Sequence, residues 1–175
     1  MSCPLSLFTG PWADLPLSEL AGMARSWGYR AVELASWGDH LEVQRAVGEG
    51  GALESKADLL RESGLEVSAV GCHRVSAAIC EGSHSGMRHL LPEHVWGDGD
   101  SEGIRQRASA EVIATARVAA RLGANLLTGF TGSSIWNRLT GYPWPKPDEI
   151  SAALADFSRR FHPILNELRE LGIRY

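Results

Sequence analysis

A short pattern recurs four times along the chain and constrains its fold more than any other feature of the sequence. Each copy is an amphipathic helical segment, then a glycine, then a short apolar run. The copies lie at residues 26–34, 62–70, 121–127 and 170–175. A glycine just past a helix accepts the left-handed conformation that closes the last turn, so a strand can follow at once. The repeat therefore predicts strands that alternate with helices.

The predicted strands lie at about 5–9, 30–35, 65–70 and 124–129. Between them, an apolar stripe from Leu17 to Trp27 predicts one helix with Pro16 at its first position, and a second stripe predicts a longer helix over 104–122 capped by Asp100 or Ser101. A last helix opens near Asp148. Strands separated by helices are typical of βαβ units in a parallel sheet, which can be an open doubly wound sheet or part of a closed barrel.

Composition excludes several classes of protein. The chain has 175 residues and a formal net charge of -4, without the basic run that nucleic-acid binding usually requires. No apolar stretch approaches the roughly 20 residues that span a bilayer, and the N-terminus has no basic leader, so we expect a cytoplasmic protein without membrane or nucleic-acid partners. The three cysteines form no CxxC pair and are expected to be reduced thiols.

Tryptophans gather in the segments that follow the predicted strands. Five of the six tryptophans lie there: Trp12, Trp37, Trp96, Trp136 and Trp144. In a barrel, the loops after the strands carry the chemistry. Flat aromatic rings beside hydroxyls and imidazoles suit a polyhydroxylated ligand, because ring faces stack on the C–H surfaces of sugars. The alternative is that these rings only pin long loops to the rim, and the sequence leaves both interpretations open.

Three stretches, 28–43, 95–108 and 128–136, resemble the sugar phosphate isomerase/epimerase family with the xylose isomerase-like TIM barrel. The resemblance implies an eight-stranded (β/α)₈ barrel with a divalent metal, Mn²⁺, Mg²⁺, Co²⁺ or Zn²⁺. It also implies isomerisation or epimerisation of a sugar, sugar phosphate or cyclitol by proton transfer through an enediolate, with the metal stabilising the enediolate oxygens.

The metal ligands of that family come from strands five to eight, whereas this sequence reaches Tyr175 where strand five is just starting. We therefore expect residues 1–175 to be the N-terminal half of one barrel: four βα units, the start of strand five, no metal ligand, and catalytic residues beyond Tyr175. Such a half leaves a sheet edge and an apolar face uncovered. Self-association, with a homo-oligomer as one outcome, is expected of the isolated chain.

The first half of such a barrel would still contain half of the substrate pocket, and several residues are candidates to line it. His73 directly follows the third strand, where an imidazole can hydrogen-bond a substrate hydroxyl or oxyanion. Trp37, Asp39 and His40 follow the second strand and are weaker candidates. Glu33 interrupts an apolar strand, and by alternation it points away from its neighbours. It positions substrate or metal, or it forms a structural ion pair with an arginine.

The loop after the fourth strand supplies further candidates. Thr131 and Ser133 are interpreted as hydroxyl donors to substrate, with Trp136 and, after the first strand, Trp12 as stacking surfaces. The loop lacks the second glycine of a hydrolase G-x-S-x-G elbow and the lysine of a phosphate-binding loop. A turn that merely packs on itself is the alternative.

The long segment 74–100 suggests a lid over the pocket. Its histidines, His84, His89 and His94, match no common zinc spacing and are interpreted as solvated. Asp98 and Asp100 are interpreted as turn and cap residues.

An isomerase or epimerase is the leading functional hypothesis. The alternatives are a noncatalytic barrel fragment that binds a sugar or a protein, and a metal-dependent endonuclease of the same superfamily, which the net charge disfavours.

Overall fold

The computed structural model describes residues 5–81, 85–136 and 142–175. These residues form two compact units. The first unit comprises Met1–Cys72, Ala114–Thr128 and Leu171–Tyr175. The second comprises His73–Ile113 and Gly129–Glu170.

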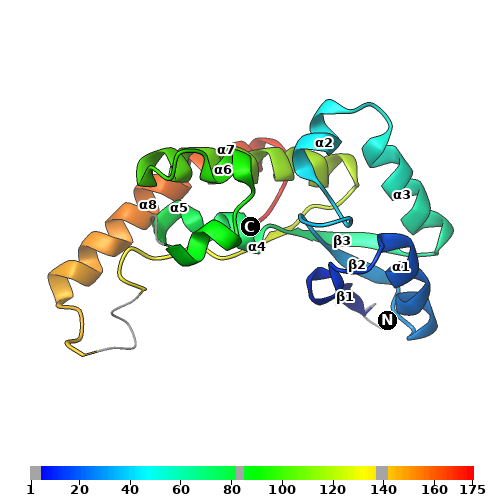
Figure 1. The fold of residues 1–175 in the computed structure, drawn as a ribbon, viewed down its shortest axis with the longest axis horizontal. Coiled ribbons are helices and arrows are strands. Elements are labelled where there is room, and N and C mark those ends of the chain that lie inside the picture. Colours follow the sequence, from blue (N-terminus) through cyan, green and yellow to red (C-terminus); the bar gives the residue numbers. More distant parts are fainter. Residues whose placement is uncertain (1–4, 82–84, 137–141) are drawn as a thin grey trace. The chain divides into compact units, whose positions relative to one another are not determined.

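A parallel sheet of four strands forms the centre of the first unit (Figure 1). The strands are β1 (Ser6–Phe8), β2 (Ala31–Ala35), β3 (Glu66–Gly71) and β4 (Leu127–Thr128), in the spatial order β1-β2-β3-β4. All four predicted strands are confirmed, although β4 is shorter than expected. Leu126 pairs in parallel with Arg174 in an isolated bridge, so the chain begins a fifth position in the sheet after β4.

Helices follow the strands as the repeat predicts. After β1 and β2 these are η1 (Gly10–Trp12), α1 (Leu17–Ser26), α2 (Val43–Gly48) and α3 (Ala52–Glu62). The expectation for Pro16 was off by one position, because it is the N-cap and α1 begins at Leu17. Trp27 lies just past the end of α1 and is exposed, where the apolar stripe predicted a helical residue.

The second unit is helical. It contains α4 (His73–Ser76), α5 (Ala78–Glu81), η2 (Ser85–His89), α6 (Glu93–Trp96) and α8 (Pro147–Glu170). The helix α7 (Ser101–Arg121) starts in this unit and ends in the first. Asp100 caps α7 as predicted, since its Oδ2 accepts the Gly103 N–H at 2.7 Å. The segment expected to be a lid thus folds largely into short helices, while His84 lies outside the described residues.

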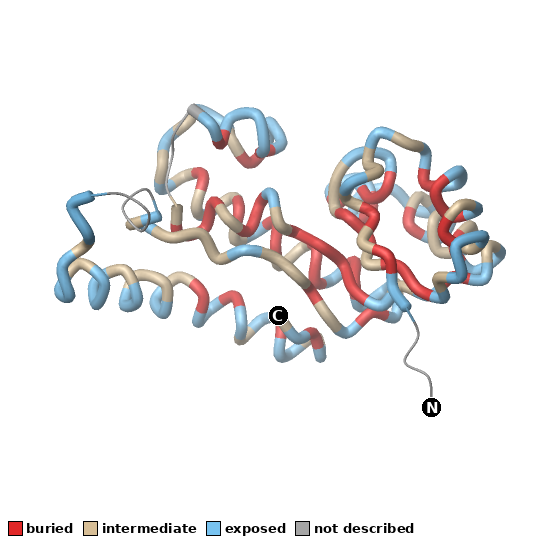
Figure 2. The backbone as a smooth tube through the Cα atoms, turned by 90° about the horizontal axis from the view of Figure 1, so that it is seen from below, coloured by how far each residue is buried: buried red, intermediate tan, exposed pale blue. Residues whose placement is uncertain are grey.

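Buried residues follow the strands and the inner faces of the helices (Figure 2). In β2 the alternation separates Val32 and Leu34, both buried, from Glu33 on the other face. Cys72 and Cys80 are free thiols, as predicted, and burial raises the pKa of the Cys80 thiol to about 11, which leaves it unreactive at neutral pH. In the described part of the chain, no helix is both long and apolar enough to cross a bilayer.

Ion pairs add to the apolar contacts of the second unit. Arg160 of α8 makes paired hydrogen bonds of 3.1 and 3.2 Å to Glu102 of α7, and it also bonds Asp156 on its own helix at 2.9 Å. The Arg160 side chain is only 12% exposed and Asp156 is 20% exposed, so water screens their contact less than a surface pair, whereas Glu102 is 52% exposed. The start of α7 is thereby fixed to α8.

Candidate functional site

Glu33 and Thr128 meet on one face of the sheet although their strands are not neighbours. The Thr128 hydroxyl donates to Glu33 Oε1 at 2.5 Å, and β3 lies between the two strands. The register places Ala69 beside Glu33 and Gly71 beside Thr128. Because both β3 residues are small, the Glu33 side chain can cross that strand. One partner of this carboxylate is therefore a neutral hydroxyl at the carboxyl end of β4.

The tryptophans in the loops after β1 and β2 pack against other aromatic rings. Trp37 and Phe8 pack edge to face, with ring centroids 5.9 Å apart and an interplanar angle of 76°. Gly10 lies so close that an added Cβ would come within 2.8 Å of the Trp37 ring. Trp12 packs at 6.0 Å against Trp27. Trp12 and Trp37 thus hold their loops in place, which is one of the two interpretations that the sequence leaves open. That these rings also stack on a ligand stays a prediction.

Asp39 and His40 both make contacts within the first unit. Asp39 Oδ2 accepts the Leu17 N–H at 2.9 Å. His40 is fully buried, and its Nε2–H donates to the Leu15 carbonyl at 3.1 Å. Burial lowers the pKa of His40, so its ring is held neutral. The observed contacts of both residues hold the loop after β2 in place.

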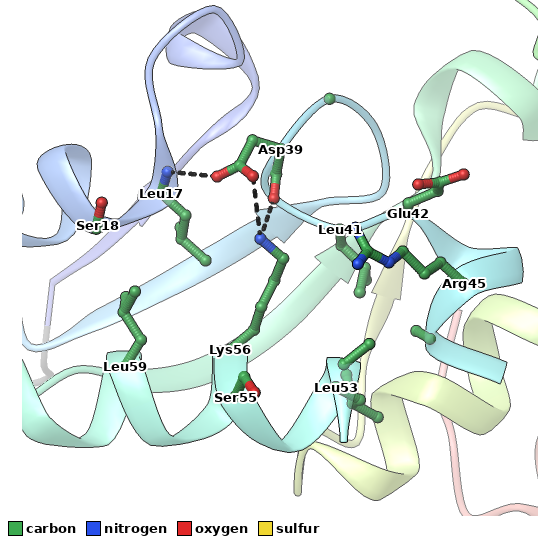
Figure 3. Close-up of a pocket in the computed structure, with 13 residues that line it drawn as sticks. Leu17, Ser18, Asp39, Leu41, Glu42, Arg45, Leu53, Ser55, Lys56 and Leu59 are labelled. Atoms are coloured by element: carbon green, nitrogen blue, oxygen red, sulfur yellow. Dashed lines mark hydrogen bonds and ion pairs between the residues drawn. The ribbon is translucent and has the colours of Figure 1, made fainter. Parts of the chain in front are cut away.

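A groove of about 410 Å³ lies beside this loop (Figure 3). It is lined by the loop and by α1, α2 and α3, with no strand residue among its described walls. In Figure 3, Lys56 extends from α3 toward Asp39, and Arg45 lies on the α2 side. The groove therefore belongs to the helical layer of the unit, away from the Glu33 carboxylate.

His73 begins α4 in the second unit and contacts the loop after β4. Its ring packs edge to face against Phe130, with centroids 5.1 Å apart. Phe130 also lines a groove of about 420 Å³ together with Thr131, Ser133 and Trp136. Phe130 and Trp136 are each 62% exposed. The structure thus brings three of the predicted residues to one groove and places His73 against its Phe130.

The loop that forms this groove is held by its own hydrogen bonds. The Ser76 hydroxyl accepts the Phe130 N–H at 3.0 Å. The Thr131 hydroxyl donates to the Gly132 carbonyl at 3.0 Å, and Ser133 Oγ accepts the Ile135 N–H at 3.3 Å. These bonds are those of a self-packed turn. Ser133 keeps its own proton for donation, because a hydroxyl that accepts one hydrogen bond can still donate another.

The remaining candidates of the long segment have structural partners. His94 Nε2 lies 3.0 Å from Glu111 Oε2, so this histidine is paired with a buried carboxylate where the sequence suggested only solvation. Asp98 accepts the Asp100 N–H, as predicted for a turn residue. His89 is exposed. Among the described residues, no three His, Cys, Asp or Glu side chains are grouped closely enough to hold a metal ion.

Four contact residues were not found from the sequence: Phe8, Lys56, Thr128 and Phe130. Thr128 and Phe130 flank Gly129 at the end of β4, and the alternation of side chains across a strand was the one signal that could have selected Thr128. Phe8 and Lys56 act through contacts distant in sequence, which no local pattern reveals.

Comparison with known proteins settles the choice between an open sheet and a barrel. The model of the family described as Xylose isomerase-like TIM barrel matches residues 22–175, and the chain belongs to this family. Its four parallel strands are thus part of a (β/α)₈ fold. A comparison with curated proteins found no match.

Solved structures agree with this fold. A xylose isomerase domain protein from Alicyclobacillus acidocaldarius is 23% identical, with a TM-score of 0.57 over 99% of this chain and 48% of its own. D-psicose 3-epimerase from Clostridium cellulolyticum H10, solved with D-tagatose, is 11% identical, with a TM-score of 0.59 over 98% and 50%. A xylose isomerase-like TIM barrel protein from Mycobacterium smegmatis, in complex with magnesium, is 15% identical, with a TM-score of 0.58 over 98% and 53%. The chain spans about half the length of these structures.

Proposed function

We propose that this chain supplies the substrate-binding part of an isomerase or epimerase that acts on a sugar, a sugar phosphate or a cyclitol. The observation that carries the proposal is the hydrogen bond by which Glu33, in the middle of β2, reaches Thr128 at the carboxyl end of β4, in a chain of the xylose isomerase-like family. Active sites of this barrel lie at that end of the strands. Residues 1–175 are proposed to form the first half of a single barrel domain.

The proposed reaction transfers a proton at a carbon next to a carbonyl, through an enediolate. Glu33 accepts a hydrogen bond from a substrate hydroxyl, while Thr128 fixes its carboxylate in one orientation. His73 donates to a hydroxyl or to the developing oxyanion. The groups that remove and return the proton are not assigned among the described residues.

The loop residues are proposed to hold the rest of the substrate. In the first unit, Trp12 and Trp37 offer ring faces to the C–H surface of a sugar. In the second unit, Trp136 offers a ring face, and Thr131 and Ser133 offer hydroxyls. Asp39 and His40 were candidates for direct contact with substrate, but their observed bonds to Leu17 and Leu15 favour a role in holding the loop.

A divalent metal is part of this proposal, because the xylose isomerase-like TIM barrel protein from M. smegmatis was solved in complex with magnesium. The described side chains of this chain do not fit a metal site by themselves, because they offer no group of three ligands. No step is therefore derived through a metal.

Deuterium exchange tests this proposal with a panel of candidate substrates. The gene product that contains these residues is incubated in D₂O with D-fructose, D-tagatose, D-fructose 6-phosphate or a keto-inositol, with Mg²⁺, Mn²⁺, Co²⁺ or Zn²⁺ present. Proton NMR should show loss of a C–H signal next to the carbonyl of at least one substrate.

Two matched variants locate the site. Glu33→Gln should slow the exchange at least about tenfold, which corresponds to about 1.4 kcal/mol. Glu66→Gln should leave it unchanged, because Glu66 is exposed at the opposite end of the neighbouring strand. No exchange with any of these compounds would refute the isomerase proposal. Saturation-transfer signals from a sugar without exchange would instead favour a noncatalytic sugar-binding protein.

A further inference from the structure

The loop after β2, residues 36–42, lies against the loop after β1. Gly38 adopts a φ of +66°, and a Cβ added there would come within 2.8 Å of the Ala13 carbonyl oxygen. An L-residue with a side chain is strained at this φ, and the oxygen leaves no room for a side chain. Gly38 is therefore a point at which the backbone of this loop packs closely against the backbone of the loop after β1.

Asp39 ties this loop to α1. The residue before α1 is Pro16, which makes no side-chain cap, and the Leu17 N–H is instead bonded by Asp39 Oδ2 at 2.9 Å. Asp39 thus caps a helix from a loop 22 residues further along the chain. The Leu17 N–H, together with the Lys56 ammonium, holds the pKa of the Asp39 carboxyl below its ordinary value.

Lys56 ties the same loop to α3. Its ammonium contacts the Asp39 backbone carbonyl and lies 3.4 Å from Asp39 Oδ1 (Figure 3). The Lys56 side chain is 27% exposed, and its ammonium is aimed along the groove wall at the loop. Because one of its partners is the backbone carbonyl of Asp39, Lys56 holds the backbone of the loop as well as the Asp39 side chain.

Trp37 lies two residues before Asp39 in this loop. Its ring packs edge to face on Phe8 and lies so near Gly10 that a Cβ added there would come within 2.8 Å of it, so a change in the path of the loop would change these contacts. Only Gly38 separates Trp37 from Asp39, so a displacement of Asp39 reaches Trp37 through the backbone.

We propose that Lys56 is a positioning residue that holds Trp37 at the substrate face through Asp39. It contacts no substrate, since it acts from α3 on the helical side of the loop. That Trp37 faces a sugar rests on the function proposed above, whereas the link from Lys56 to Trp37 does not.

The test compares three variants of the gene product. Lys56→Met removes the ammonium and keeps most of the side-chain volume, and Lys56→Arg restores a cation of similar reach. Arg61→Met is the matched control, because Arg61 lies on the same helix and pairs with Asp58 of that helix, at 2.6 Å. Far-UV circular dichroism checks that each variant is folded.

The first readout is the indole N–H resonance of Trp37 in a ¹H–¹⁵N spectrum, assigned with Trp37→Phe. Lys56→Met should shift or broaden it, whereas Lys56→Arg and Arg61→Met should leave it in place. The second readout is D-fructose exchange. Lys56→Met should raise KM about fivefold with kcat within twofold, as expected for a lost positioning contact in ground-state binding.

The two proposals fail in different ways. An unmoved Trp37 resonance and an unchanged KM in Lys56→Met would overturn the positioning role and leave the isomerase proposal intact. The positioning role would also be overturned if Lys56→Arg shifted the Trp37 resonance as much as Lys56→Met does. If the resonance moves and is restored by arginine while no variant exchanges any sugar, the link stands and the isomerase proposal fails.

Discussion

Gly132 should be the least replaceable residue of the loop after β4. Its φ is +66°, and an added Cβ would overlap the Ala77 carbonyl oxygen and come within 2.9 Å of the Glu81 backbone nitrogen. Both neighbours are backbone atoms of the segment that forms α5, so neither can turn aside as a flexible side chain would. Gly132→Ala should therefore displace the loop or the start of α5.

Two contributions set the magnitude. Placing alanine in the left-handed region costs about 1–2 kcal/mol. Forcing a methyl group into a fully packed position adds about 1–3 kcal/mol. The free energy of unfolding should then fall by about 2–5 kcal/mol.

Gly123→Ala separates the two contributions. Gly123 has a φ of +78° but no atom within 4 Å of an added Cβ, so only the conformational cost applies. With a urea dependence of about 2 kcal/mol per molar, the midpoint should fall by about 0.5–1 M for Gly123→Ala and about 1–2.5 M for Gly132→Ala. Equal midpoints for the two variants in circular-dichroism titrations would refute the close approach of the loop to α5.

Three further predictions follow from the contacts described. Thr128→Val should lower the free energy of unfolding by about 1–3 kcal/mol in urea titrations, because the Glu33 carboxylate loses a donor; no change would count against this bond. Because burial lowers the pKa of His40 below 6.5, its contribution to stability is complete above that pH and is lost as the pH falls below it. Wild-type protein should thus lose stability as the pH falls below 6.5, and His40→Asn should show a flatter profile; equal slopes would contradict the buried neutral ring. The isolated 175-residue chain should self-associate through the open edge of β1, and a monodisperse monomer in light scattering would contradict this.

The alternation of parallel strands with helices and the helix–glycine–strand repeat could be predicted because their signals are local. Each glycine that closes a helix stands in the sequence beside the strand that follows it, as Gly28 does before β2. The prediction was weakest where tertiary contacts decide. β4 keeps only two of the six residues expected, and Trp27 lies beyond the end of its helix.

The candidate site was predicted only as a set of loops. The sequence correctly placed four candidates after strands: His73, Thr131, Ser133 and Trp136. Phe130, which contacts His73 and lines the groove with the other three, is not distinguished by any local sequence pattern. Asp39 and His40 stood in the expected loop, yet their bonds run to residues more than 20 positions earlier. A single sequence shows which polar residues a loop contains, but it does not show which way each side chain turns.

Chemical-shift mapping tests the central claim, that the carboxyl ends of the strands form a sugar-binding face. ¹⁵N-labelled gene product is titrated with D-fructose, D-tagatose and D-fructose 6-phosphate, and amide shifts are followed residue by residue. The account predicts shifts concentrated in the first unit, at residues 33–37, 71–72 and 128, with at least one of these sugars. Shifts confined to the opposite ends of the strands, around Arg30, Glu66 and Asn125, or to the groove beside Lys56, would contradict it.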